Sequence, residues 1–184
     1  WQDLRTVGEC MRWKSERGLV FAPNQTATKL EWLRKNVEAA RSPHARAGTV
    51  DTWVAAVLSD FGVHATDSSN AAVTGLADHA SLSNHSWSTT VLDALNIDPG
   101  TLPKIVPTIG VVGEASALPG APPIAALVGD QQSSLVGQGG IVAGAAKATF
   151  GTGGMLDVYA GTMTPRHLAR TTNGTFPIVV YSQG

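Results

Sequence analysis

The sequence has few charged side chains, one cysteine and no long apolar run. Of its 184 residues 15% are charged, and 13 basic against 14 acidic side chains give a formal net charge of −1. No basic run is present that would attract a nucleic-acid backbone, so nucleic-acid binding is not expected. Cys10 alone excludes an internal disulfide framework. No segment approaches the roughly 18 to 20 uninterrupted apolar residues of a membrane span.

The two ends of the sequence bear on location and completeness. The start, Trp1–Arg5, lacks the basic and then apolar pattern of a secretion signal, which together with the single cysteine predicts a cytoplasmic protein. The sequence opens without Met and closes at Gly184 directly after an apolar run. We therefore expect it to be a piece of a longer protein.

Three stretches carry apolar residues at the spacing of one helical face and predict amphipathic helices: residues 28–41, 50–58 and 89–96. Trp32 in the first stretch and Trp53 in the second are expected to pack against the interior. Small and polar side chains dominate residues 64–90 and predict irregular structure there. Six prolines in residues 98–123 exclude helix from most of that segment and predict short extended pieces.

The second part of the chain is poor in charge, because only Asp130, Lys147 and Asp157 are charged between residues 121 and 163. Residues 124–128 predict a short buried strand, and residues 131–138 a helix. A strand, turn and strand pattern follows, with residues 146–152, Gly153-Gly154 and residues 155–160 predicting a hairpin. A third strand is predicted at residues 176–181, and a domain boundary near residues 138–142.

Asp130 is a candidate catalytic residue, because so isolated a charge needs a reason. It falls between a predicted strand and a predicted helix, and sites in open α/β sheets lie at the carboxyl ends of strands. A carboxylate there can accept a proton from a substrate hydroxyl. The alternative is a helix N-cap, worth ~1 kcal/mol, and the two roles are compatible.

The run Phe150–Gly154 has two interpretations. Its backbone N–H groups can approach a phosphate closely, with the Thr152 hydroxyl as a further donor. Equally, it is an ordinary Gly-Gly hairpin turn. Asp78, His79 and His85 have the spacing of neither a zinc finger nor an HExxH site, so solvated loop histidines are expected there.

Several motifs, taken in order, carry a family resemblance. Gly129-Asp130-Gln131-Gln132 is followed by Gly137-Gln138 and by Lys147-Ala148-Thr149-Phe150-Gly151-Thr152-Gly153. Upstream stand Trp1-Gln2-Asp3-x-Arg5-Thr6, Thr28-Lys29-Leu30-x-Trp32-Leu33, Gly48-Thr49-Val50-Asp51-Thr52-Trp53, His64-x-Thr66-Asp67-x-x-Asn70-Ala71 and Leu102-Pro103. With these motifs the chain resembles the FGGY carbohydrate kinases, and among them the glycerol kinases.

The resemblance implies an α/β fold of the actin and sugar-kinase type, with two ribonuclease-H-like domains and a site in the cleft between them. Residues 1–138 would form the later part of the first, substrate-side domain, and residues 139–184 the start of the second, nucleotide-side domain. The implied activity is ATP-dependent phosphorylation of a terminal hydroxyl of glycerol or a related polyol or sugar, with ATP and Mg²⁺ as cofactors.

The resemblance also implies roles for single residues. Asp130 would be the general base and would lie near the metal of Mg-ATP, and Gln131 would contact the substrate. Gly151, Thr152 and Gly153 would face the nucleotide phosphates.

Three further positions concern the substrate. By resemblance, Trp1 would pack on the carbon skeleton of the polyol. Asn24 and Met155 stand where glycerol kinases have aromatic side chains, so we expect a larger or more hydroxylated substrate than glycerol.

Two alternatives to an active kinase stay open. One is a non-catalytic sugar- or nucleotide-binding relative, and the other is a fragment without activity. Both gain weight because the family's amino-terminal phosphate-binding strand, its Arg-Glu substrate pair and its adenine-binding region have no counterpart in this sequence. The expected partners are a small polyol or sugar and ATP, and a homo-oligomer is left open.

Overall fold

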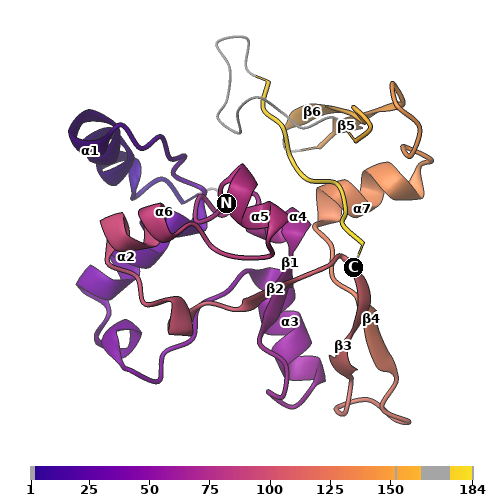
Figure 1. The fold of residues 1–184 in the computed structure, drawn as a ribbon, viewed down its shortest axis with the longest axis horizontal. Helices are drawn as coiled ribbons and strands as arrows, with labels where there is room; N and C mark the ends of the chain where they lie inside the picture. The colour runs from indigo at the N-terminus through magenta and orange to yellow at the C-terminus, as the bar shows by residue number, and fades with distance from the viewer. Residues whose placement is uncertain (1–2, 152, 163–174, 184) are drawn as a thin grey trace.

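The computed structural model describes residues 3–151, 153–162 and 175–183 (Figure 1). Its helices are α1 (Val7–Arg17), α2 (Thr26–Asn36), α3 (Val50–Leu58), α4 (Ser68–Ala71), α5 (His79–Ser83), α6 (Thr89–Leu95) and α7 (Asp130–Gly137). Two 3₁₀ turns are present: η1 (Glu38–Arg41) follows α2, and η2 (Pro99–Thr101) follows α6. The strands are β1 (Ala65–Asp67), β2 (Lys104–Val106), β3 (Ile109–Glu114), β4 (Pro123–Ala126), β5 (Ala146–Phe150) and β6 (Gly154–Val158).

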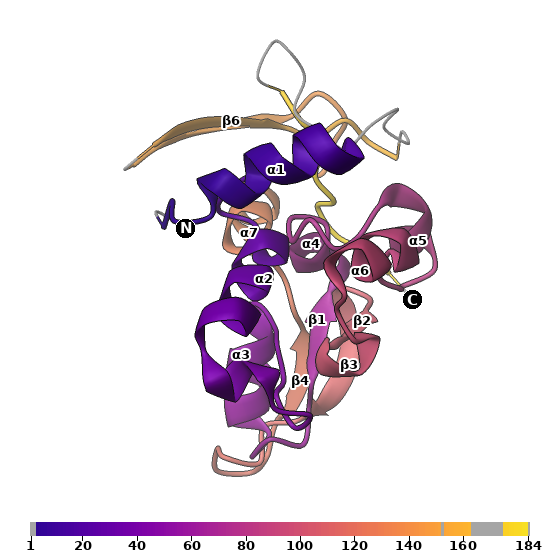
Figure 2. The ribbon, with the colours of Figure 1, turned by 90° about the vertical axis from the view of Figure 1, so that its left-hand side faces the viewer.

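The strands of the described residues pair two by two. β1 and β2 are parallel, whereas β3 with β4 and β5 with β6 form antiparallel ribbons. Both views place the β5–β6 hairpin on one side of α7 and the β3–β4 ribbon on the other (Figures 1 and 2). Helix α7 is therefore the element between the two ribbons.

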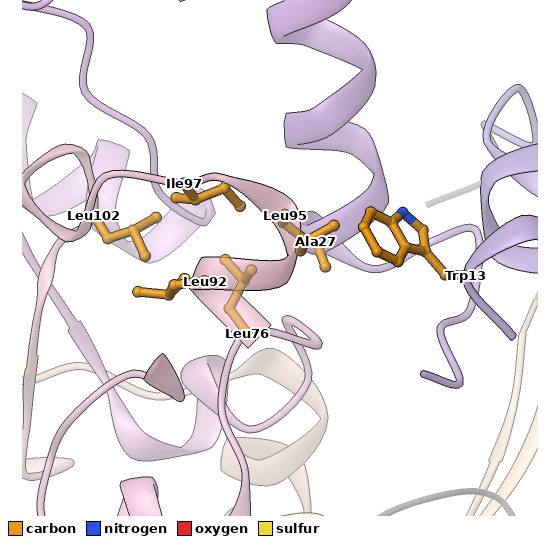
Figure 3. Packing of buried hydrophobic residues seen from close by; sticks show 7 residues of the cluster. All are labelled: Trp13, Ala27, Leu76, Leu92, Leu95, Ile97 and Leu102. Carbon is orange, nitrogen blue, oxygen red and sulfur yellow. The ribbon is translucent and has the colours of Figure 1, made fainter. Parts of the chain in front are cut away.

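The largest apolar cluster joins α1, α2 and α6. Figure 3 shows the indole of Trp13 directed toward Ala27 and Leu95. The buried members of the cluster are Trp13, Ala27, Leu76, Leu92, Leu95, Ile97 and Leu102.

A buried carboxylate fixes α1 against α2 at the edge of this cluster. Nε1 of Trp13 donates to Glu31 at 2.7 Å, and Arg12 and Lys35 donate to the same carboxylate at 2.6 and 2.7 Å. Burial alone would raise the pKa of Glu31, but the hydrogen bonds from Lys35 and Trp13 and the two positive charges lower it below its usual value.

The predicted helices form, with one change. The first prediction, residues 28–41, is wrong beyond Asn36, because Val37 is extended and only the 3₁₀ turn η1 follows. Nδ2 of Asn36, the last residue of α2, donates back to the carbonyl of Trp32 at 2.8 Å, one turn earlier in the helix. The predictions at residues 50–58 and 89–96 are confirmed by α3 and α6.

The inward packing expected of Trp53 is wrong, because 63% of this residue is exposed. Helix α3 turns its small side chains inward, with Thr52 and Ala55 buried, while Val50 and Val54 lie on the exposed side with Trp53. Small residues let the helix approach strand β1 closely, and the large ones then remain outside. The Trp53 ring instead contacts Phe61 edge to face, with ring centroids 5.9 Å apart.

Residues 64–90 are more regular than predicted. They form β1, α4 and α5, and the polar residues that suggest a loop cap these short helices. Asp67 caps α4, and Asp78 caps α5 in a reciprocal capping box with Ser81. The hydrogen bonds from Ser88 and Ser81 lower the pKa of Asp78. In residues 98–123 the prediction is confirmed, since this segment holds short extended pieces, the 3₁₀ turn η2 and a turn at residues 116–120, and no α-helix.

Two strand predictions need correction. The strand predicted at residues 124–128 forms as β4, but the burial expected of it is wrong, because β4 is half of a two-stranded ribbon and buries only Ile124. Residues 176–181 form no strand, because the extended segment meets β3 only through one isolated bridge between Ile109 and Gln183. The predicted hairpin is confirmed by β5 and β6. None of the described helices is both long and apolar enough to cross a membrane.

Candidate functional site

Asp130 is the first residue of α7, and its side chain is exposed. The N-cap is Gly129, with extended backbone, so the N-cap interpretation of Asp130 is wrong by one residue. Oδ1 of Asp130 accepts the backbone N–H of Gln131 at 2.8 Å. A negative charge is electrostatically favoured in the first turn of a helix, where free N–H groups point. The structure therefore presents a fixed carboxylate to solvent at the start of α7.

The helix behind Asp130 is held by its buried face. Gln132 and Leu135 are buried, and Nε2 of Gln132 donates to the carbonyl of Ser69 at 3.4 Å. The N–H of Gly129 donates to Oγ of Ser69 at 2.9 Å. Helix α4 thus contacts the beginning of α7 at two points.

Gln131 contacts the β5–β6 hairpin. Its side-chain Nε2 donates to Oδ1 of Asp157 on β6, and Nζ of Lys147 on β5 lies 3.4 Å from the other oxygen of Asp157. Lys147 and Asp157 face each other in the hairpin register, with side chains only 4% and 11% exposed. The three charges that stand alone in this half of the sequence therefore gather around Gln131.

Sequence reasoning missed the roles of Lys147 and Asp157. A signal for them exists, because opposite charges ten residues apart around a predicted turn fall opposite each other in an antiparallel hairpin. The isolation of the two charges in the sequence thus has its explanation in their pairing.

The hairpin carries the remaining predicted residues of this half. Met155 pairs with Thr149 and is half exposed, and Gly151 and Gly153 form the turn through a 3.2 Å hydrogen bond. Thr152 lies outside the described residues. At about 3.3 Å per residue, the turn lies about 13 Å along β5 from Lys147. The turn is thus separated from Gln131 by most of the hairpin.

Asn24 is exposed in the turn before α2, far from α7 in sequence. Oγ1 of Thr6 donates to the carbonyl of Pro23 at 3.1 Å and accepts from Thr28 at 3.1 Å, and both threonines are fully buried. These bonds bring the first motif and the second motif together beside Asn24. Within the described residues, no hydrogen bond or ion pair links Asn24 to α7 or to the hairpin. Trp1 lies outside the described residues.

Charged residues of the first motif lie against α2. The guanidinium of Arg5 lies 4.5 Å from the ring centroid of Trp32, and Lys29 lies 3.6 Å from Asp3. The backbone N–H and the guanidinium of Arg5 both donate to Asp3 and hold the pKa of this carboxyl below its usual value. The expected inward packing of Trp32 is thus only partial, since its half-buried ring is covered by Arg5.

The sequence profile of the FGGY family of carbohydrate kinases, N-terminal domain, matches residues 1–137. The chain belongs to this family. The FGGY resemblance of the motifs is therefore confirmed.

Among curated FGGY relatives, the glycerol kinase of Methylibium petroleiphilum is 38% identical over 176 residues, which cover 88% of this chain and 35% of that protein. The glycerol kinase of Trichodesmium erythraeum is 35% identical over 198 aligned positions, covering 100% of this chain and 38% of that protein. The chain thus spans little more than a third of the length of the curated relatives it matches.

Solved structures show the sugar-kinase fold for this FGGY chain. A crystal structure of Plasmodium falciparum glycerol kinase with ADP superposes with a TM-score of 0.85 at 26% identity, covering 98% of this chain and 38% of that one. A xylulose kinase from Rhodospirillum rubrum gives a TM-score of 0.72 at 20% identity, covering 84% and 34%. The predicted α/β fold of the actin and sugar-kinase type is confirmed.

Proposed function

We propose that this chain is the part of an ATP-dependent carbohydrate kinase that carries its general base, Asp130. The substrate is glycerol or a related polyol or sugar, phosphorylated on a terminal hydroxyl. The observation that carries the proposal is the exposed carboxylate at the start of α7 in a chain that belongs to the FGGY family.

Asp130 would accept the proton of the substrate hydroxyl while that oxygen attacks the terminal phosphorus of ATP and ADP leaves. Its exposed position gives a substrate hydroxyl access, and its fixed backbone sets the direction of the carboxylate. Gln131, the next residue, would contact the substrate. Its amide is held by Asp157, so its place beside Asp130 does not depend on the substrate.

The turn Gly151–Gly153 would face the nucleotide phosphates. A Cβ added at Gly151 or Gly153 would meet no atom within 4 Å, so the turn borders open space. A phosphate oxygen can therefore approach the backbone of the turn, where the N–H of Gly151 already donates to the carbonyl of Gly153. The hydroxyl of Thr152 would add a donor.

Mg²⁺ would neutralise charge on the transferring phosphoryl group when bound with ATP. The described residues contain no cluster of three or more His, Cys, Asp and Glu that could hold a metal by themselves. A lone exposed carboxylate fits a magnesium ion that takes most of its ligands from phosphates and water. Asp130 is the residue of this chain that would lie next to it.

The substrate is proposed to be larger or more hydroxylated than glycerol. Asn24 offers an amide and half-exposed Met155 a flexible thioether where glycerol kinases have aromatic rings, and Trp1 would cover the carbon skeleton. A panel of polyols and sugars tests this, since a protein that turns over glycerol best contradicts it.

We further propose that residues 1–138 and 139–184 belong to different domains of the whole protein. This division separates α7 from the β5–β6 hairpin and places the base and the phosphate turn on opposite sides of a cleft. Closing such a cleft would exclude water and limit ATP hydrolysis. A cytoplasmic location and a homo-oligomeric state stay predictions, tested by fractionation and by light scattering.

The deciding experiment measures ADP release by the whole protein with and without polyol. We expect release to require a polyol and to fall at least about a hundredfold in Asp130→Asn, since a general base contributes ~10²–10⁴-fold. Asp93→Asn, a change of an exposed aspartate on α6, is the matched control and should keep full activity. Ligand binding without any ADP release would instead favour a non-catalytic relative.

A further inference from the structure

Asp67 is a buried carboxylate with an unusual number of donors. It is fully buried at the end of β1, and in the described part of the chain no Lys, Arg or His forms an ion pair with it. Both backbone N–H groups of Ser69 and Asn70 donate to it at 3.0 Å, and so do their side chains at 2.9 Å. Oγ1 of Thr108 adds a fifth bond at 2.6 Å. Hydrogen bonds alone therefore compensate this buried charge.

Capping α4 does not account for all five bonds. As the N-cap of α4, Asp67 accepts the backbone N–H groups of Ser69 and Asn70, and this accounts for two of the five bonds. The bond from Thr108 reaches the start of β3, and the hydroxyl of Ser69 continues the chain of bonds to Gly129. The carboxylate is thus the centre of a network that ends beside Asp130.

The direction of this network is fixed by chemistry. A carboxylate only accepts, so the single proton of the Ser69 hydroxyl points to Asp67 at 2.9 Å. The lone pairs of the same oxygen then face the N–H of Gly129, 2.9 Å away. The Ser69 oxygen, oriented by Asp67, therefore holds the N–H of Gly129 in one direction. The two hydrogen bonds strengthen each other, because bonds in such a chain polarise one another.

We propose that Ser69, oriented by Asp67, is a positioning residue for Asp130. The proposal rests on the proposed function, in which Asp130 is the general base. Ser69 fixes the N-cap of α7 through Gly129, and its carbonyl accepts from Gln132 on the same helix. The chain is therefore tied to α4 on both sides of Asp130, by the backbone N–H of Gly129 and by the side-chain amide of Gln132. Misplacing a catalytic group by about 1 Å can cost ~10²-fold in rate, so the two bonds that hold the start of α7 matter for activity.

A role for the motif His64-x-Thr66-Asp67-x-x-Asn70 follows. Its Asp has no access to a substrate, since Asp67 is fully buried, and the side chain of Asn70 bonds to it. They build the short helix α4, which carries Ser69 to the start of α7 although 60 residues separate Ser69 from Gly129.

Ser68 provides a matched control for Ser69. Both serines lie buried on α4, and each hydroxyl makes a hydrogen bond outside its helix. The hydroxyl of Ser68 meets that of Ser182 at 3.1 Å and has no bond to α7. Ser69→Ala and Ser68→Ala therefore remove the same group from neighbouring positions, and only the first breaks the link to Gly129.

The first test measures amide hydrogen exchange at Gly129 in the whole protein, by mass spectrometry with residue-level fragmentation. We expect exchange at Gly129 to speed up at least about tenfold in Ser69→Ala and to stay within about twofold in Ser68→Ala. Equal exchange in the two variants overturns the proposal. If Ser69→Ala does not fold, Ser69→Cys fills the same space with a weaker acceptor and must show the same direction of change.

The second test is kinetic. We expect Ser69→Ala to lower kcat at least about tenfold with KM changed less than about threefold, because a displaced base affects the transition state and not substrate binding. Ser68→Ala should keep both constants. Faster exchange at Gly129 with unchanged kcat overturns the positioning role. Full activity in Asp130→Asn overturns the proposed function, and the positioning of a base falls with it, whereas the exchange result at Gly129 would stand.

Discussion

Gln131 donates its side-chain amide to Asp157, although the two are 26 positions apart in sequence and the predicted domain boundary lies between them. Asp157 in turn lies 3.4 Å from Nζ of Lys147, and both charges are nearly buried. The contact ties helix α7 to the hairpin that carries the glycine-rich turn. Gln131, which we propose to contact the substrate, is thus linked through one buried ion pair to the hairpin that carries the proposed phosphate turn.

The first prediction concerns this pair. Asp157→Leu leaves the ammonium of Lys147 buried without a partner, and breaking a buried pair in this way costs about 3–5 kcal/mol. Adding Lys147→Met removes the stranded charge, so the double variant should recover most of the loss. Denaturant unfolding, monitored by amide exchange in residues 146–158, measures the unfolding free energy of the single and the double variant. Additive losses in the double variant would show that the two charges do not stabilise each other.

The second prediction concerns pH. The pKa of Glu31 lies below its usual value of 4.5, so the ionised carboxylate stabilises the folded state. This contribution is complete above the usual pKa and is lost as pH falls through the lowered folded pKa. Glu31→Gln should therefore flatten the fall in unfolding free energy below about pH 4.5. Urea unfolding between about pH 3 and pH 7 measures it. Exposed Glu38→Gln, on η1 and outside this network, is the control for the substitution itself.

The third prediction compares two glycines. A Cβ on Gly48 would lie 2.5 Å from Cγ2 and 2.6 Å from Cβ of Thr52, a buried side chain that has no room to move. Gly48→Ala should therefore cost about 1–3 kcal/mol of unfolding free energy. A Cβ on Gly8, inside α1, would meet no atom within 4 Å, and Gly8→Ala should stabilise by ~0.5–1 kcal/mol. Equal melting temperatures for the two variants would contradict the close contact.

Local patterns predict the elements that near neighbours in the sequence determine. Helix α7 and the hairpin β5–β6 follow from apolar spacing and from glycine pairs, which act over short stretches of chain. The position of Asp130 at the start of α7 follows in the same way, wrong by one residue as an N-cap. Such features need no knowledge of what lies opposite in the fold.

Features that depend on distant partners are not predictable in this way. Asp67 and Asp78 suggest a loop, because a capping side chain and a loop side chain look alike in sequence. The link from Ser69 to Gly129 spans 60 residues and leaves no periodic signal. The outward face of α3 is misjudged for the same reason, since apolar spacing shows that a helix has an apolar face but not whether another element covers it.

The last prediction compares the same substitution, Trp to Phe, at buried Trp13 and at exposed Trp53. Trp13 is buried and donates to Glu31, so Trp13→Phe leaves a buried carboxylate oxygen without its donor and should cost about 1–3 kcal/mol. Trp53→Phe removes little buried area and keeps an aromatic ring against Phe61, so its unfolding free energy should change by less than about 0.5 kcal/mol. Urea unfolding monitored by circular dichroism compares the two variants. It does not depend on tryptophan fluorescence, which each substitution lowers. A larger loss at Trp53 than at Trp13 would mean that the apolar side of α3 is covered in the folded protein, as its spacing first suggested.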